Sequence, residues 1–180
     1  ETLNLPTEPT RRGYAFLGWF TQETGGTQVD GNTVFKEVAS TTYYAHWEEA
    51  TVFSVVVPAV LPVTVDQNGK VYVSNAEIVN HSTAAVQVSS VTLTAENGWT
   101  LVPYASDMSH AKVDSNQIGF KINSAQTSKT GNTEQFVLTS PWKIAEEDSL
   151  TLSYDAVVSA LSQPVTNANI LCVLFVVEWA

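Results

Sequence analysis

The chain has 180 residues, of which 44% are hydrophobic and only 14% charged, and its net charge is −10. This is enough apolar material for one domain or two small ones, and it argues against intrinsic disorder. The acidic balance repels phosphate backbones and anionic lipid, so we expect no nucleic-acid partner. The apolar run at 170–177 is far shorter than the roughly 20 residues that a membrane helix needs, so we expect no membrane insertion in this fragment.

Residues 1–49 form a first segment, which a boundary near Glu48–Thr51 separates from the rest. Large rings at Tyr14, Phe16, Trp19 and Trp47 are dense for so short a stretch. We expect them to form the core of a small domain, because such a domain has few other large side chains to bury. An aromatic platform for stacking carbohydrate is the alternative.

This first segment resembles one repeat of the Listeria–Bacteroides repeat family, also called the internalin B-repeat. The shared pattern is Leu-x-Leu-Pro, a Pro-Thr-basic stretch, Gly-Tyr-x-Phe-x-Gly-Trp, a Gly-Gly-Thr turn and Tyr-Tyr-Ala-x-Trp, running from Leu3 to Trp47 without insertions. We expect Gly25-Gly26 to form a hairpin turn. The resemblance implies a small β-grasp-like module of large secreted or wall-attached bacterial proteins, without enzymatic activity and with neighbouring repeats in the same chain. Family members usually begin with a further strand, which is missing here and would leave an open edge.

Residues 50–180 are predicted to form an antiparallel β-sandwich of roughly eight to ten strands, because short alternating runs are separated by turn signals. Asn68-Gly69 predicts a hairpin turn. The alternation changes phase at Ser89-Ser90, which predicts a bulge or a strand crossing between sheets. Residues 150–161 alternate with period two and are predicted to form one strand. The segment is only weakly similar to bacterial Ig-like surface domains.

The last apolar run, "ILCVLFVVEW" at 170–179, is predicted to be a central strand covered on both faces. It contains Cys172, the only cysteine, so no intrachain disulfide can form. We expect Cys172 to be a small buried apolar residue rather than a reactive thiol. The lack of a disulfide fits a secreted protein of a Gram-positive bacterial surface, and it fits a cytosolic protein as well.

No motif predicts a catalytic, cofactor or metal site. His46, His81 and His110 lack a second His or Cys at metal-ligand spacing. Residues 106–110, "SDMSH", bring Ser, Asp and His together without a nucleophile elbow, so we expect a polar surface loop. Glu146–Asp148 is typical of a solvated turn.

Three further motifs have a structural and a chemical interpretation each. Residues 66–69, "DQNG", offer a single carboxylate, too few for a calcium site. Asn80–Ser82 is a glycosylation sequon by rule, although a bacterial protein is expected to leave it unused. Lys121 could form an intramolecular isopeptide bond with an asparagine. The simpler expectation is that it faces out, because Phe120 beside it faces the core.

The leading hypothesis is a non-enzymatic cell-surface adhesion or stalk fragment of an extracellular, Gram-positive bacterial protein, with an unknown protein or glycan ligand. The alternative is a carbohydrate-binding module of a secreted enzyme, for which Trp99 and Trp142 are the candidate ligand-stacking residues because both lie near strand starts. A third hypothesis is a component of a surface fibre that pairs through an open sheet edge.

Overall fold

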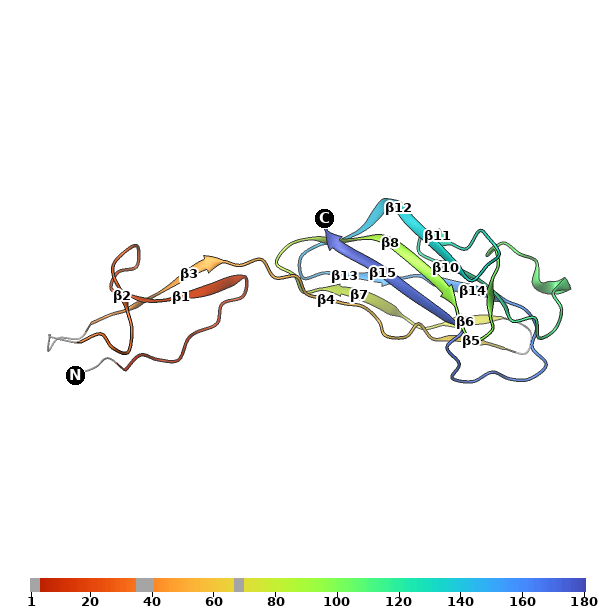
Figure 1. Ribbon diagram of the computed structural model, residues 1–180, viewed down its shortest axis with the longest axis horizontal. Coiled ribbons are helices and arrows are strands. Elements are labelled where there is room, and N and C mark those ends of the chain that lie inside the picture. The colour runs from red at the N-terminus through yellow and green to blue at the C-terminus, as the bar shows by residue number, and fades with distance from the viewer. Residues whose placement is uncertain (1–3, 35–40, 67–69) are drawn as a thin grey trace. The chain divides into compact units, whose positions relative to one another are not determined.

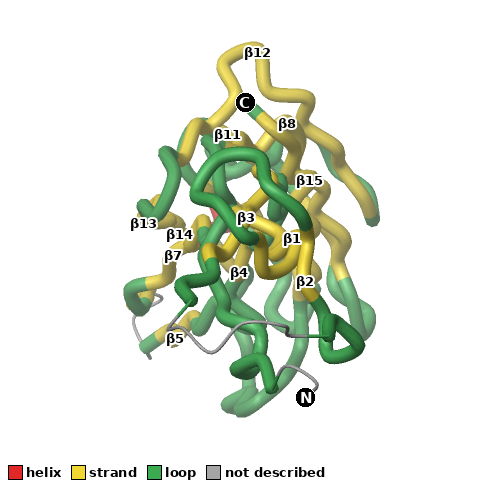
Figure 2. Tube along the Cα trace, turned by 90° about the vertical axis from the view of Figure 1, so that its left-hand side faces the viewer, coloured by secondary structure: helices red, strands yellow, loops and turns green. Residues whose placement is uncertain are grey.

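A computed structural model describes residues 4–34, 41–66 and 70–180. Strands and loops make up nearly all of this part of the chain, and the one helical element in it is a short 3-10 turn, η1 (Met108–His110) (Figure 2). The chain divides into two compact units, Glu1–Phe53 and Ser54–Ala180, which we call unit 1 and unit 2. The prediction of an all-β protein is confirmed.

Unit 1 contains an antiparallel sheet in the order β2-β1-β3, formed by β1 (Tyr14–Phe20), β2 (Gln28–Val29) and β3 (Tyr44–Glu49). Gly25 and Gly26 have positive φ in the loop, residues 21–27, that joins β1 to β2. The two strands form a hairpin, but through a longer loop than the predicted glycine turn. The register between β1 and β3 skips one residue at Leu17, where β1 bulges. The bulge returns Trp19 to the sheet face that already carries Phe16.

Unit 2 is built from twelve strands among its described residues. They are β4 (Val55–Val56), β5 (Val63–Val65), β6 (Val71–Val73), β7 (Ala76–Asn80), β8 (Val86–Ala95), β9 (Thr100–Leu101), β10 (Gln117–Ile122), β11 (Ala125–Gln126), β12 (Thr133–Ile144), β13 (Ser149–Leu152), β14 (Tyr154–Val158) and β15 (Leu171–Trp179). All their pairings are antiparallel except that of β9 with β10. The predicted turn at Asn68-Gly69 lies outside the described residues, between the paired strands β5 and β6.

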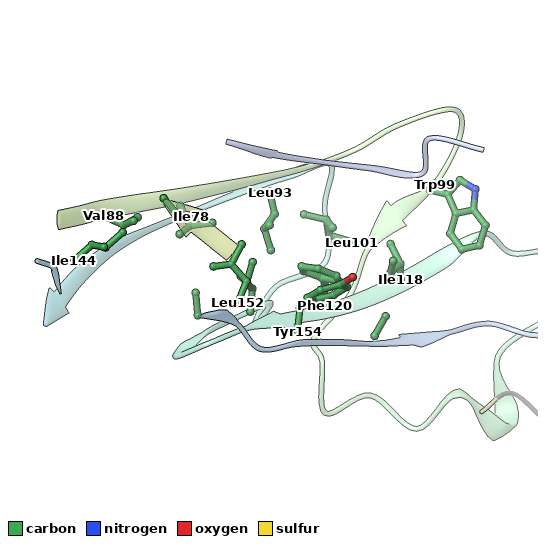
Figure 3. Packing of buried hydrophobic residues seen from close by; sticks show 14 of the residues in the cluster. Ile78, Val88, Leu93, Trp99, Leu101, Ile118, Phe120, Ile144, Leu152 and Tyr154 are labelled. Carbon is green, nitrogen blue, oxygen red and sulfur yellow. The ribbon is translucent and has the colours of Figure 1, made fainter. Parts of the chain in front are cut away.

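The strands of unit 2 are layered as in a sandwich (Figure 1). One sheet has the order β12-β8-β15. The other strands include β13-β7-β4 and β11-β10-β14, and their inward side chains share one core with those of β8. Val88 and Leu93 of β8 lie in the same cluster as Phe120 and Tyr154 (Figure 3). Burial of this cluster is the main source of stability that the fold offers.

Strand β8 is the central strand of its sheet and carries the predicted irregularity. Its register skips Ser89 against both β12 and β15. As a result Ser90 and Val91 are both buried, although they are adjacent in the strand. The phase change predicted at Ser89-Ser90 is thus confirmed as a β-bulge.

The prediction for the last apolar run is wrong, because β15 is an edge strand with β8 as its neighbour. Its side chains alternate between half-buried and exposed. Cys172 lies on the outward face and is exposed, which corrects the expectation of a buried cysteine. An apolar run on both faces is typical of a central strand, but an edge strand with an apolar outer face has the same pattern.

Residues 150–161 form parts of two strands rather than one. β13 pairs with β7, whereas β14 pairs with β10, and the break falls at Ser153. Asn123 holds this break, since its side-chain oxygen accepts a hydrogen bond from Ser153 N–H (2.8 Å) and its own N–H donates to Ser153 O (2.7 Å). The period-two pattern continues across the break because both halves face the same core.

Candidate functional site

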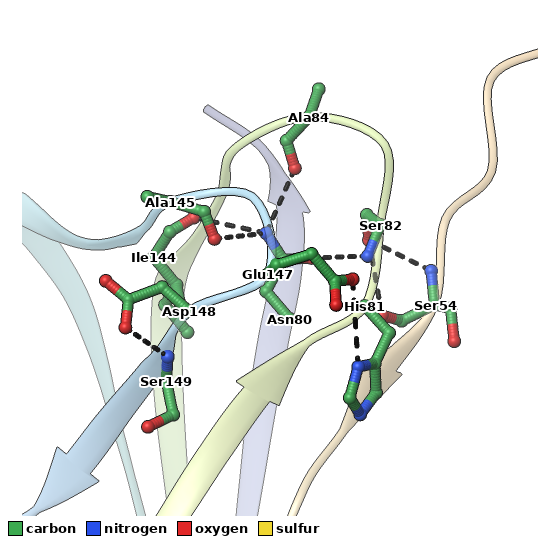
Figure 4. A network of polar contacts seen from close by, with 10 residues as sticks. All are labelled: Ser54, Asn80, His81, Ser82, Ala84, Ile144, Ala145, Glu147, Asp148 and Ser149. Carbon is green, nitrogen blue, oxygen red and sulfur yellow. Dashed lines mark hydrogen bonds and ion pairs between the residues drawn. The ribbon is translucent and has the colours of Figure 1, made fainter. Parts of the chain in front are cut away.

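A buried polar network surrounds Asn80 at one end of unit 2 (Figure 4). Its Nδ2 donates to the carbonyl oxygens of Ala84 (3.0 Å), Ile144 (3.3 Å) and Ala145 (2.8 Å), and its Oδ1 accepts from Ser82 N–H (2.8 Å). Asn80 is fully buried. The sequon asparagine is therefore engaged in folding contacts, and its amide is closed to glycosylation in the folded chain.

The same loop holds the first and the last residue of unit 2. Ser82 Oγ accepts from Ser54 N–H (2.9 Å), and His81 N–H donates to Ser54 O (2.8 Å). Ala180 N–H donates to Ala85 O (3.1 Å). The chain thus enters and reaches the end of this unit at one place, which we call the terminal end.

The opposite end of unit 2 carries long loops, at 103–116 and 159–170, which we call the distal loop surface. The turn η1 lies there, far from the C-terminus (Figure 1). Asp114 joins the two loops: its carboxylate accepts from Ser162 N–H (2.8 Å) and from Ser162 Oγ–H (2.7 Å). These hydrogen bonds hold the pKa of Asp114 below its ordinary value.

Two exposed valines lie on this distal loop surface, Val113 and Val165, which are 50% and 51% exposed. They stand one residue before Asp114 and three residues after Ser162, so the Asp114–Ser162 link fixes the chain beside each of them. Apolar side chains that a polar link holds in place on long loops are a common starting point for recognition.

The Ser-Asp-His motif forms part of the turn η1. Ser109 Oγ lies 2.9 Å from His110 Nδ1, and Asp107 Oδ2 lies 3.4 Å from the same nitrogen. In a catalytic triad the serine and the aspartate contact opposite nitrogens of the imidazole. The Asp107 carboxylate also caps the turn by accepting from Ser109 N–H (2.9 Å), and these hydrogen bonds with Ser109 lower the pKa of Asp107. The geometry is that of a capped, exposed turn.

The two candidate stacking residues have different surroundings. Trp99 is only 8% exposed and belongs to the hydrophobic core (Figure 3), so it offers no open ring face to a sugar. Trp142 is half-buried, and its Nε1–H donates to Ser124 Oγ (2.9 Å). Burial thus removes Trp99 from the stacking candidates and leaves Trp142.

A shallow pocket of about 250 Å³ lies next to this tryptophan contact. It is lined by Ser124, Ala125 and residues 136–140 of β12. The pocket exists because β12 makes an excursion: Val137 pairs with Ser90 and Trp142 with Val88, which leaves residues 138–141 outside the ladder. The lining contains the hydroxyl groups of Ser124, Thr139 and Ser140 beside apolar side chains. The pocket is small for a drug-sized ligand.

The remaining candidate residues have structural contacts. Lys121 is exposed and faces away from the core, as predicted, with its Nζ 5.9 Å from the Tyr104 ring. The Asp66 carboxylate accepts from Lys70 N–H (2.9 Å) at the base of the β5–β6 pair. Among the described residues, no group of three or more His, Cys, Asp or Glu side chains is arranged to hold a metal ion.

In unit 1 the aromatic rings of the repeat motif pack against one another. The Phe16 ring lies edge-on to those of Trp19 (5.6 Å between centroids) and Trp47 (5.4 Å). All three are half-buried, so they form a small apolar layer on one sheet face. The Arg11 guanidinium lies 3.9 Å from the centroid of the Tyr14 ring and covers its face.

The opposite face of this sheet carries the one histidine of unit 1. The His46 ring is stacked on Phe20 at 3.9 Å between centroids, and its Nε2 lies 2.9 Å from Gln22 O. Both contacts of the imidazole are made within unit 1. His46 therefore packs on the sheet and contacts the loop that follows β1.

Unit 1 is thus a small all-β module. Its sheet has a bulge at Leu17, and the Phe16 ring packs against Trp47 of β3. Residues 1–46 match the family model of the Listeria-Bacteroides repeat domain, so this segment is similar to a repeat of that family. Such repeats occur in surface or secreted bacterial proteins. Residues 47–180 lie outside the matched range, and the searches of curated proteins and of solved structures gave no match.

A helix long and apolar enough to cross a membrane is not found among the described residues.

Proposed function

We propose that the chain is a non-enzymatic adhesive part of a bacterial protein that is secreted or attached to the cell wall. In this proposal unit 1 is one repeat of a spacer, and unit 2 presents its distal loop surface to a protein or glycan ligand. The repeat match supports the setting at the cell surface. The hydroxyl-rich composition, with only 14% charged residues, supports it further.

The observation that carries the proposal is the meeting of both ends of unit 2 at the terminal end. Ser54 and Ala180 are hydrogen-bonded to the same loop, residues 80–85. In a domain that serves as a spacer in a stalk, the N-terminal and C-terminal connections lie at opposite ends. If the chain continues beyond Ala180, both of its connections lie at the terminal end of unit 2, and the far loops are left clear of them, as in binding domains.

The absence of enzymatic activity is part of the same proposal. The turn that contains Asp107, Ser109 and His110 places both potential partners of the imidazole on one nitrogen. It is also exposed, so it excludes no water from any reaction centre.

The test is a binding screen with the full chain. The chain is immobilised and probed with glycans of bacterial and animal cell surfaces and with extracellular-matrix proteins, at physiological salt. The proposal predicts saturable binding to at least one probe and no turnover of it. Turnover of a probe would contradict the proposal, as would the absence of saturable binding throughout the screen.

The carbohydrate-binding alternative is favoured by one observation, the pocket beside the Trp142–Ser124 contact. On this alternative, soluble polysaccharides quench or shift the fluorescence of Trp142, and Trp142→Phe changes their affinity. A double change of Val113 and Val165 to Ser would leave the affinity unaltered. The adhesive proposal predicts the reverse pattern, so the two sets of variants separate the hypotheses.

A further inference from the structure

The two edges of the β12-β8-β15 sheet differ in how they are protected against pairing with another strand. The β12 edge is interrupted by the excursion at residues 138–141, which contains Pro141, and it carries Lys143. Pro, Lys and bulges are the usual means of blocking an edge. The β15 edge runs for nine residues, Leu171–Trp179, with no Pro, Lys or Arg.

The main chain of β15 also directs N–H and C=O groups outward, where another strand could pair with them. Glu96 N–H donates to Ile170 O (3.0 Å) next to one end of the strand, and Ala180 N–H donates to Ala85 O (3.1 Å) next to the other. In an antiparallel pair such bonds join opposite residues, so the even-numbered residues of β15 turn their main-chain groups toward β8. The odd-numbered residues Val173, Phe175 and Val177 turn theirs away from it.

The side chains along this edge are incompletely covered on both faces. On the outer face Leu174 is 59% and Val176 is 41% exposed. On the inner face Val173, Phe175 and Val177 are only half-buried, whereas Val88, Val91 and Leu93 of the neighbouring β8 are fully buried. The core of unit 2 is therefore open along β15, and one more strand would close it.

We propose that this edge is closed by β15 of a second copy of the chain, which pairs antiparallel about a two-fold axis at Phe175. This register uses all nine residues of the strand. It places Leu174 opposite Val176 of the second copy, and Val173 opposite Val177 of the second copy. Phe175 meets its own equivalent, and their outward main-chain groups form a hydrogen-bonded pair.

Charge is compatible with this self-pairing. Glu178 is the single charged residue of β15, and in the proposed register it lies opposite Cys172 rather than opposite its own equivalent. Its carboxylate already accepts a hydrogen bond from Gln87 (3.2 Å). Two copies of net charge −10 nevertheless repel one another at long range, so added salt strengthens the dimer by screening.

The first test is the mass of the full chain in solution, measured by sedimentation at about 100 μM, where a micromolar contact is saturated. We expect a dimer, and a tighter one in about 0.5 M salt, where the Debye length falls to a few ångströms. Val176→Lys should raise the dissociation constant at least about tenfold, because it places two ammonium groups in an apolar contact. The matched change Val137→Lys, on the outer face of the protected β12 edge, should leave the dimer unaltered.

The second test reads the register. In a Cys172→Ala background, Leu174→Cys and Val176→Cys are purified separately, and both side chains are exposed, so the fold tolerates the changes. Mixing the two variants should give a mixed disulfide under mild oxidation, because opposite residues of an antiparallel pair have Cα atoms within disulfide range. Each variant alone, and Val137→Cys, should cross-link far more slowly.

Three outcomes would overturn the proposal. They are a chain that stays monomeric in about 0.5 M salt at this concentration, a dimer that Val176→Lys leaves intact, and equal cross-linking of the mixed and the separate variants. The inference does not depend on the proposed adhesive function, since the dimer would form with or without a ligand at the distal loop surface.

Discussion

Asn80 shows how a single buried side chain fixes the ends of a domain. Its amide donates to three carbonyl oxygens and accepts from one N–H group. Ala84 and Ser82 belong to the loop that also holds Ser54 and Ala180, whereas Ile144 and Ala145 lie at the end of β12. The sequence marks this position only as part of an Asn-x-Ser motif, whose common interpretation is an exposed modification site. Nothing in the local pattern distinguishes a buried asparagine from an exposed one, because its partners at residues 144–145 are distant in sequence.

Asn80→Ala should lower the free energy of unfolding of unit 2 by about 3 kcal/mol, since it removes the acceptor of Ser82 N–H and a buried donor to the carbonyl oxygens of Ala84, Ile144 and Ala145. Urea unfolding followed by circular dichroism measures the change. Ser149→Ala is the control, because it removes an exposed hydrogen bond to Glu77 and should cost less than about 0.5 kcal/mol. An equal effect of the two variants would show that the network does not hold the fold.

Gly18 explains one fixed position of the repeat motif. Its φ is +132°, and a Cβ there would lie 2.4 Å from Gln28 Nε2, whose N–H donates to Leu17 O (2.9 Å). A side chain would therefore strain the backbone at the bulge that brings Phe16 and Trp19 to the same face, and it would displace the Gln28 amide. Both the positive φ and the close approach of the Gln28 side chain favour glycine at this position.

Gly18→Ala should destabilise unit 1 by about 2 kcal/mol or more, through backbone strain and the displaced Gln28 amide. Gly31→Ala is the matched control, because no atom lies within 4 Å of the added Cβ and its φ is not in the positive range. Differential scanning calorimetry of the full chain measures both variants. The account fails here if Gly31→Ala is the more damaging change, or if Gly18→Ala leaves unit 1 unaltered.

At the scale of elements, the link between the two distal loops depends on one carboxylate. The pKa of Asp114 is lowered by its hydrogen bonds with Ser162, so the ionised form is the one that binds. A group with a depressed folded pKa contributes stability above its unfolded pKa, and this contribution is lost as the pH falls through the folded value. The link between the loops is accordingly present at neutral pH and lost in acid.

The Ser162 amide proton reports this loss directly. Its NMR chemical shift should titrate with a midpoint below the ordinary aspartate value of 3.8, and Asp114→Asn should abolish the titration. A midpoint at or above 3.8 would contradict the assigned hydrogen bonds.

Elements were predicted well where alternation was clean and poorly where burial depended on neighbours. The phase change at Ser89-Ser90 and the positive φ of Gly25 and Gly26 follow from local chemistry, and the structure has both. The position of β15 does not follow, because strand order in a sheet is set by contacts between distant segments. The excursion of β12 was likewise hidden, since "EQFVLT" and "WKI" look like two strands when their common partner β8 is unknown.

At the scale of the whole molecule, the fold class could be predicted better than the candidate site. The all-β class could be recognised from short alternating runs between turn signals, and the resemblance of the first segment to the repeat family from glycine and aromatic spacing. The candidate surface could not, because it depends on which end of unit 2 is far from Ser54 and Ala180. The hydrogen-bonded residues Asp114 and Ser162 are 48 apart in sequence, and no sequence motif predicts their contact.

The central claim, that unit 2 binds through its distal loop surface, is tested most directly by paired valine substitutions in the full chain. Val113→Ser with Val165→Ser changes two exposed side chains at the distal loops. Val56→Ser with Val137→Ser changes two of similar or greater exposure elsewhere on the unit, at 54% and 76%. With a probe that binds the wild-type chain, the account predicts that the distal pair weakens binding at least about tenfold, as loss of central apolar contacts does, and that the other pair has no effect. Equal affinity of the distal pair and the wild type would contradict it.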